Sequence, residues 1–320
     1  MLGLEVKNKF FYTQFVIIKK YGVFLMKDDF INLETEKVRK KNRNKSNTVP
    51  TLVDDFILEY DAISSALRKN KKKISKAVST FTEVFSRGGS IYFIGAGTSG
   101  RLGVLESSEC PPTFGTDPKR IISIMAGGKS AVFKSKEGAE DSSTDSIKDL
   151  RAKNYSKNDL LIGISASGKS EYVLSAIKFA KGIKSKTILI SCNKLKKNIS
   201  DLDIVLNVGP EFVAGSTRLK SGTATKTVLN IITTVSMMKL EKIYKNMMID
   251  ISPSTRKLKA RLIRNLSNIL GKNQKTAIDL LEKSRWSIRI ALIMNKMDVS
   301  YKRAKILSEQ ISITEMLDEK

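Results

Sequence analysis

Short apolar runs alternate with helix-length amphipathic segments through the middle of the chain. The apolar runs occupy residues 90–97, 120–128, 159–167, 186–192 and 203–209. Strands separated by helix-length segments are typical of βαβ units, in which the sheet is parallel and helices cover both of its faces. The pattern therefore predicts an α/β fold whose core is a parallel sheet.

Helical patterns lie on both sides of this region. Two are found between Thr51 and Gly89, and the second has apolar residues at helical spacing: Ile74, Val78, Phe81 and Phe85. After about residue 255 the strand signals cease, and amphipathic helices are expected at 257–270, 274–285, 287–297 and 301–311, with Trp286 as a packing anchor. We predict three parts: an N-terminal extension and arm (1–49), a sheet domain (50–255) and a small helical module (256–320).

The first 25 residues are apolar and basic but lack the layout of a signal peptide. Lys19 and Lys20 interrupt the apolar stretch, and no small-residue cleavage site follows. Met26 begins a more ordinary segment, so residues 1–25 are interpreted as an upstream extension or a misassigned start. No apolar run in the chain reaches the roughly 18 residues that a membrane-spanning helix needs, and no membrane association is expected.

The chain of 320 residues contains no histidine and only two cysteines, Cys110 and Cys192. The lack of histidine excludes Ser-His-Asp and Cys-His catalysis and removes the commonest metal ligand. One cysteine pair cannot build a zinc site or a disulfide framework, which favours a cytoplasmic location. Both cysteines are expected to be buried and inert, with a catalytic role as the alternative.

A formal net charge of +25 raises the possibility of nucleic-acid binding. The lysines, however, are scattered over almost every expected helix and turn. The clusters at 37–45 and 68–73 lack interleaved aromatic residues that could stack on bases. We therefore interpret the charge as solvated surface without a nucleic-acid partner, although a positive field would attract small anions.

Three polar turns follow expected strands: residues 95–100, 165–170 and 215–226. At the carboxyl ends of parallel strands, helix N-termini present free N–H groups, and small residues let the backbone approach an anion. The first turn does not have the glycine spacing of a dinucleotide site, and no acidic residue ends the second strand to hold a ribose. A single phosphate group on a small molecule fits better, although each turn alone could be only a tight, capped connection.

Carboxylates near these turns are the candidates for acid–base chemistry. Glu106 and Glu109 are three residues apart on one helix, which we expect to end at Pro111 and Pro112. Glu109 is then on the order of 14 Å from the first turn along the helix axis. A second acidic group, Glu137, Glu140 and Asp141, follows the next strand. The alternative for each is an exposed helix charge or cap.

The sequence motifs together resemble one family. The segments GAGTSGRLGVLESSECPPTFGT, EGAEDS, GISASGKSEYV, ISCN and VAGSTRLKSGTATKTVLN are similar to those of N-acetylmuramic acid 6-phosphate etherases, members of the sugar-isomerase (SIS) superfamily. The resemblance implies a five-stranded parallel SIS sheet flanked by helices, a helical C-terminal module and a homodimer. It also implies cleavage of the D-lactyl ether of N-acetylmuramate 6-phosphate by elimination and hydration, with no metal or organic cofactor. The basic stretch after residues 33–36 is longer than is usual in the family.

The resemblance also implies roles for individual residues. Glu109 would protonate the departing lactate oxygen and later activate water, and Glu140 would remove the C2 proton of the sugar. Substrate binding falls on Thr98, Ser99, Gly100, Ser165, Ser167, Gly168 and Ser170, with Arg218 and Lys220 as candidates for the carboxylate or phosphate. Glu106 and Glu137 would be supporting residues. The alternatives are an aldose–ketose isomerase of the same superfamily and a sugar-phosphate-binding regulator.

Overall fold

The computed structural model describes residues 16–19, 22–25, 30, 32–39 and 48–318. Five parallel strands form the central sheet, as the sequence pattern predicts: β3 (Ile91–Gly95), β4 (Ile121–Met125), β5 (Leu160–Ile164), β6 (Lys186–Ser191) and β7 (Leu202–Val205). Their order across the sheet is β4-β3-β5-β6-β7. Because all five run in the same direction, their carboxyl ends lie along one edge.

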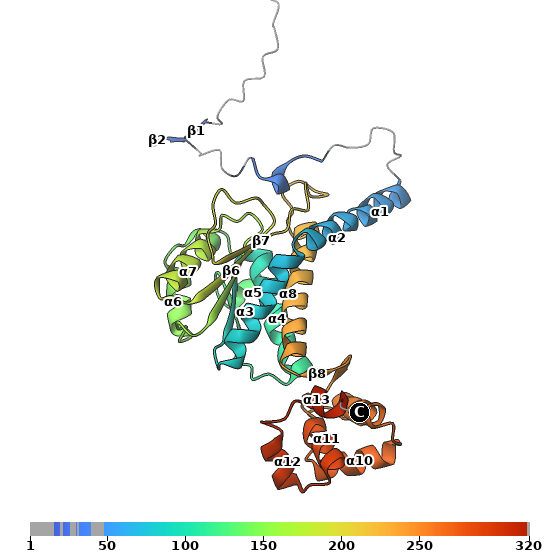
Figure 1. Ribbon diagram of the computed structural model, residues 1–320. Helices are drawn as coiled ribbons and strands as arrows, with labels where there is room; N and C mark the ends of the chain where they lie inside the picture. Colours follow the sequence, from blue (N-terminus) through green and yellow to red (C-terminus); the bar gives the residue numbers. More distant parts are fainter. Residues whose placement is uncertain (1–15, 20–21, 26–29, 31, 40–47, 319–320) are drawn as a thin grey trace, which may run out of the picture.

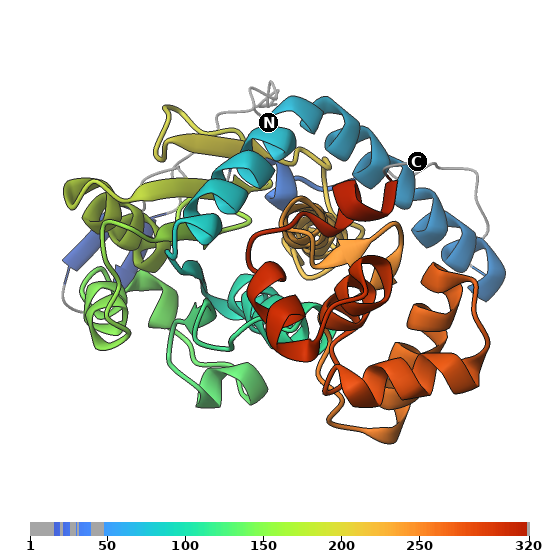
Figure 2. The ribbon, with the colours of Figure 1, turned by 60° about the horizontal axis from the view of Figure 1, so that its bottom comes forward.

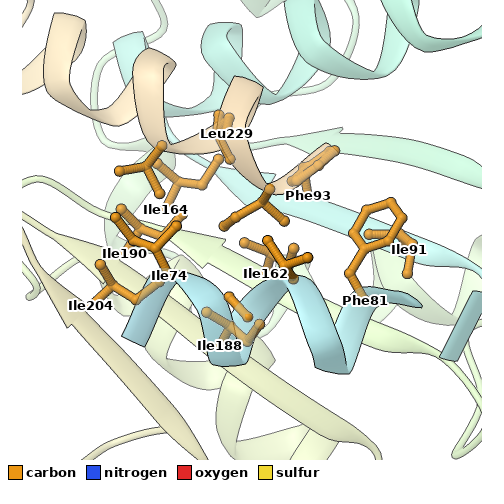
Figure 3. Close-up of a cluster of buried hydrophobic side chains, with 14 of the residues drawn as sticks. Ile74, Phe81, Ile91, Phe93, Ile162, Ile164, Ile188, Ile190, Ile204 and Leu229 are labelled. Carbon is orange, nitrogen blue, oxygen red and sulfur yellow. The ribbon is translucent and has the colours of Figure 1, made fainter. Parts of the chain in front are cut away.

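Alternate residues of each strand point to opposite faces of the sheet, and each face has its own apolar core. In β3, Phe93 belongs to the core beneath α3 (Lys71–Ser86) and α8 (Lys220–Lys239), whereas Ile94 belongs to the core on the other face. Figure 3 shows the first core, in which Phe81 of α3 and Leu229 of α8 meet isoleucines of the strands. Both faces of the sheet are therefore buried, which explains its nearly continuous apolar strands.

Helices cover the two faces in separate groups (Figure 1). The group on the first face is α3, α4 (Gly97–Phe114) and α8, preceded by α2 (Tyr60–Lys69). The second face carries α6 (Asp145–Ala152) and α7 (Glu171–Gly182). Two short helices, α5 (Ser130–Phe133) and the 3₁₀ turn η2 (Ala139–Asp141), complete the connection from β4 to α6.

The prediction that α4 ends at its two prolines is wrong. The helix continues through Pro111 and Pro112 to Phe114, because the φ angle that proline imposes is compatible with a helix, although each proline removes one backbone N–H donor. Gly115 ends the helix in the left-handed conformation, with φ of 64°. A Cβ at this position would lie 1.7 Å from the carbonyl oxygen of Asp250, so this close contact requires glycine.

The C-terminal helices pack together (Figure 2) and enclose a third hydrophobic core, separate from the two cores of the sheet. They are α9 (Arg256–Leu270), α10 (Gln274–Lys283), α11 (Ile288–Met297), α12 (Tyr301–Leu307) and α13 (Ile313–Asp318). The side chains of Thr255, Asn273, Ser287 and Ser300 cap the first four of these helices, which explains where they begin. The core also includes Tyr244 from a small hairpin of β8 (Ile243–Tyr244) and β9 (Met247–Met248), and Trp286 packs against it.

The N-terminal part contains a short segment beside the sheet and a projecting helix. Residues 32–39, called the arm, include the 3₁₀ turn η1 (Glu34–Glu36). Helix α1 (Val49–Leu58) extends away from the sheet domain (Figure 1), and none of its ten residues is buried. Even its apolar side chains are in contact with solvent: Val49 is 74% exposed and Ile57 is 59% exposed. Much of the extension predicted at residues 1–25 lies outside the described residues. The described part of it consists of two paired strands, β1 (Val16–Lys19) and β2 (Gly22–Leu25). Among the described helices, none is long and apolar enough to cross a membrane.

Candidate active site

A cavity of about 290 Å³ lies at the carboxyl ends of β3 and β5, and we call it the main pocket. Five segments that are far apart in the sequence form its walls. They contribute Phe30, Leu33, Thr35 and Glu36; Ala96, Gly97, Thr98 and Ser99; Glu140 and Asp141; Ile164, Ser165, Ala166, Ser167, Lys169 and Ser170; and Gly215 and Thr217. The pocket therefore joins two of the hydroxyl-rich turns, the start of the third, and one of the acidic groups.

The first turn brings Thr98 and Ser99 to the pocket at the N-terminus of α4. No side chain of the described residues caps this helix end, so its first N–H groups are available to an anion. Gly100 lies outside the lining and has a packing role instead. A Cβ at Gly100 would lie 2.7 Å from the carbonyl oxygen of Gly95, so glycine lets the helix pass close to the strand.

The second turn also lines the main pocket, and we call the first and second turns together the anion cradle. Ser165 and Ser167 point their hydroxyls at each other with an Oγ–Oγ distance of 3.4 Å, and the N–H of Lys169 donates to Ser167 Oγ at 3.1 Å. Gly168 has a φ of 71°, which lets the chain turn back sharply before α7. These hydroxyls and the positively charged Lys169 give the turn the donors that a phosphate group requires.

Glu140 faces the same pocket as the serines. The hydroxyl of Ser170 donates to the carbonyl oxygen of Glu140 at 3.2 Å, which ties the acidic turn η2 to the start of α7. Burial raises the pKa of Glu140, and the negative charges of Asp141 and Glu137 raise it further. A carboxylate with a raised pKa is a stronger base than an ordinary glutamate, which suits proton removal from carbon. Glu137 lines a smaller adjoining cavity rather than the main pocket.

The two glutamates of α4 have different environments. Glu106 is buried against α8, where Asn230 Nδ2 donates to its carboxylate at 2.6 Å and the hydroxyl of Thr233 donates to the other oxygen. Burial raises the pKa of Glu106, and these two hydrogen bonds oppose the rise. Glu109 is exposed and lies outside the lining of the main pocket. The roles expected for Glu109 and Glu140 require both carboxylates to reach one substrate, but within a single chain only Glu140 lines the main pocket.

Arg218 and Lys220 also lie outside the main pocket. Both line a separate hollow of about 200 Å³ beside α2. The side-chain ammonium of Lys220 is buried in an ion pair with Glu59. The backbone N–H of Lys220 donates to the buried carboxylate of Glu211 at 3.0 Å. Lys220 therefore holds the beginning of α8 in place and is not available to an anion in the main pocket of the same chain.

The pocket residues that the sequence-based set of substrate-binding residues lacks include Thr35, Glu36 and Lys169. Lys169 could have been found, because it lies inside the second polar turn between Ser167 and Ser170. The arm residues give no comparable signal, since their short acidic segment is far in the sequence from every strand of the central sheet.

The cysteines are not part of the site. Cys110 and Cys192 are both buried, as expected. Burial raises the pKa of the Cys110 thiol to about 12 and that of the Cys192 thiol to about 11, so both remain protonated and poorly nucleophilic at neutral pH. Within the described residues, no group of three or more cysteine, aspartate or glutamate side chains has a metal-binding arrangement.

Comparison with known proteins finds relatives along most of the chain. The N-acetylmuramic acid 6-phosphate etherase of Clostridium beijerinckii is 40% identical over 294 residues, which cover 90% of this chain and 96% of that protein. The N-acetylmuramic acid 6-phosphate etherase 1 of Bacillus licheniformis is 40% identical over 284 residues, covering 88% and 92%. The corresponding etherase of Francisella philomiragia is 40% identical over 276 residues, covering 85% and 94%.

A family model described as the N-terminal SIS domain of glucokinase regulatory protein matches residues 73–181. This range begins in α3 and ends in α7, so it includes the first two polar turns.

Proposed function

Because the chain belongs to the N-acetylmuramic acid 6-phosphate etherase family, we propose that it cleaves the D-lactyl ether of N-acetylmuramate 6-phosphate. The products are N-acetylglucosamine 6-phosphate and D-lactate. The observation that carries the proposal is a hydroxyl-lined cavity that also holds Glu140, whose pKa is raised. A cytoplasmic location accompanies the proposal, since both cysteines are free thiols.

The phosphate group binds where the two hydroxyl-rich turns converge. Thr98 and Ser99 contribute at the start of α4, and Ser165, Ser167 and Ser170 contribute before α7. The uncapped helix N-termini add N–H donors and favourable dipoles, and Lys169 supplies a positive charge. With its phosphate held there, the substrate extends across the cavity toward Glu140.

Glu140 acts as the base in the first chemical step. It takes the proton from C2 of the open-chain sugar, and the electron pair of that C–H bond forms a C2–C3 double bond. The C3–O bond breaks, its electrons move to the lactate oxygen, and an acid protonates that oxygen. Water then adds across the double bond, so the net reaction is hydrolysis of the ether.

Glu109 supplies the acid from a second copy of the chain. Two features support a homodimer. Helix α1 exposes apolar residues along its length, and an apolar groove of about 560 Å³ lies between α3 and α8, lined by Ile74, Val78, Ile231 and Val235. In a two-fold dimer each copy gives the same surface to the other, so if Glu109 of one copy reaches the main pocket of its neighbour, the reverse contact forms as well and both sites are complete.

Mixing two inactive variants tests this arrangement. Glu109→Gln and Glu140→Gln are each expected to fold and bind sugar phosphate but to release no D-lactate. When the two variants are co-expressed, half of the dimers are mixed and each mixed dimer has one intact site. About a quarter of wild-type lactate release should therefore return. A mixture as inactive as its components would rule out the shared site, and full activity of Glu109→Gln alone would remove this residue from the mechanism.

A sugar-phosphate-binding regulator remains the second candidate, because the family model that matches residues 73–181 is named for a regulatory protein. This candidate predicts binding of sugar phosphates without turnover. Purified wild-type protein that binds N-acetylmuramate 6-phosphate and yields no D-lactate would favour the regulator over the etherase.

A further inference from the structure

The arm is fixed to the sheet domain through Thr35, which is completely buried. Its N–H donates to Asn193 Oδ1 at 3.3 Å, and its hydroxyl accepts from Asn193 Nδ2 at 3.0 Å. Its carbonyl oxygen accepts from the N–H of Gly215 at 2.9 Å. A shift of the arm by one residue would bury Glu34 or Glu36 in place of threonine, and an unpaired buried carboxylate is costly. The contacts therefore specify one register for the arm.

This register directs Glu36 to the main pocket. Its carboxylate lies beside Gly215, where an added Cβ would be 2.6 Å from Glu36 Oε2, so glycine leaves the space that the carboxylate occupies. Glu34, two residues earlier, is not among the lining residues and pairs with Lys37 at 2.5 Å. Within the part of the chain that the structure describes, no hydrogen bond or ion pair engages the Glu36 carboxylate.

An unpaired carboxylate on the wall of this pocket has a restricted choice of ligand groups. It repels a phosphate group, whose binding donors are on the two turns that contain Thr98 and Ser99 and residues 165–170. It accepts hydrogen bonds from hydroxyl groups, and such charge-assisted bonds are stronger than neutral ones. A sugar phosphate held by its phosphate therefore presents the right partners to Glu36, because its remaining polar groups are mostly hydroxyls.

We propose that Glu36 binds a hydroxyl group of the sugar and thereby selects a polyhydroxylated ligand over a simple phosphate. The inference rests on the proposed function, because it takes the ligand to be a sugar phosphate. It assigns the arm a direct part in substrate recognition, with Thr35 as the anchor and Glu36 as the contact.

The test measures binding by calorimetry with two probes, N-acetylglucosamine 6-phosphate and inorganic phosphate. Glu36→Ala is expected to weaken binding of the sugar phosphate about tenfold to a hundredfold, because a hydrogen bond to a charged group is lost. Binding of inorganic phosphate should not change. Glu36→Gln keeps an acceptor and should lose less affinity than Glu36→Ala. Glu34→Ala is the matched control, and it should bind both probes like the wild type.

Three results would overturn the inference: unchanged affinity of Glu36→Ala for the sugar phosphate, an equal loss for both probes, or a larger loss in Glu36→Gln than in Glu36→Ala. An equal loss would mean that the change disturbs the pocket as a whole. The readout does not depend on lactate release. If Glu36→Ala weakens sugar-phosphate binding but the wild-type protein releases no lactate, the etherase function alone is refuted. If the wild-type protein releases lactate but Glu36→Ala binds the sugar phosphate with unaltered affinity, this inference alone is refuted.

Discussion

Replacing Asn193 by alanine removes the side chain that ties the arm to the sheet domain. The Asn193 amide makes three hydrogen bonds: two with Thr35 and one, at 2.9 Å, to the carbonyl oxygen of Ala166. At about 0.5–1.5 kcal/mol for each bond, the substitution should lower the free energy of unfolding by roughly 1.5–4.5 kcal/mol. The two bonds to Thr35 account for about 1–3 kcal/mol of this sum. The population with a detached arm should therefore rise roughly fivefold to 150-fold.

Hydrogen exchange followed by mass spectrometry measures the arm directly. In Asn193→Ala, peptides that contain Thr35 and Gly215 should lose protection by that factor, and the Michaelis constant for the sugar phosphate should rise. Asn265→Ala is the control, because Asn265 is also buried but belongs to the helical module, where it donates to the carbonyl oxygen of Met248 in β9. It should lower stability without affecting the arm. If Asn193→Ala loses stability while Thr35 keeps its protection, the arm is held by other contacts and the reasoning fails.

Further predictions concern the acid–base group, the phosphate turn and the thiols. Because the charge of Asp141 raises the pKa of Glu140, Asp141→Asn should lower that pKa. Glu140 then stays deprotonated at lower pH, so the acidic limb of the kcat/KM profile should move to lower pH. A limb that stays in place would argue against Glu140 as the base. Ser167→Ala should weaken both inorganic phosphate and sugar phosphate, unlike Glu36→Ala, and unaltered inhibition by phosphate would place the anion elsewhere. Cys110 and Cys192 should react with a thiol reagent only after denaturation, since both are buried; fast labelling of the native protein would contradict this.

The sheet could be predicted from the sequence because each strand carries its own signal. Residues 91–95 and 160–164 are continuous apolar runs that fit burial on both faces, and a polar turn follows each of them. Since the carboxyl ends of parallel strands share one edge, local patterns predict that Ser99 and Ser165 lie on the same side of the sheet, and the pairing of β3 with β5 then brings them into a single cavity.

The misplaced residues depend on contacts between distant parts of the chain. Lys220 forms an ion pair with Glu59, and no local sequence pattern near either residue predicts this contact. Glu106 and Glu109 are three residues apart and were expected on one face, yet contact with Asn230 and Thr233 on α8 selects Glu106 for burial and leaves Glu109 exposed. Helix spacing cannot decide which of two acidic residues faces a neighbouring helix.

The bond from the Ser170 hydroxyl to the Glu140 carbonyl has a consequence for how the site moves. Ser170 begins α7 at the anion cradle, whereas Glu140 belongs to the turn that carries the base. The bond opposes displacement of one element relative to the other, so the anion-binding turn and the base are coupled in their movement. A ligand seated by its charged tail then keeps a more constant reach to the carboxylate.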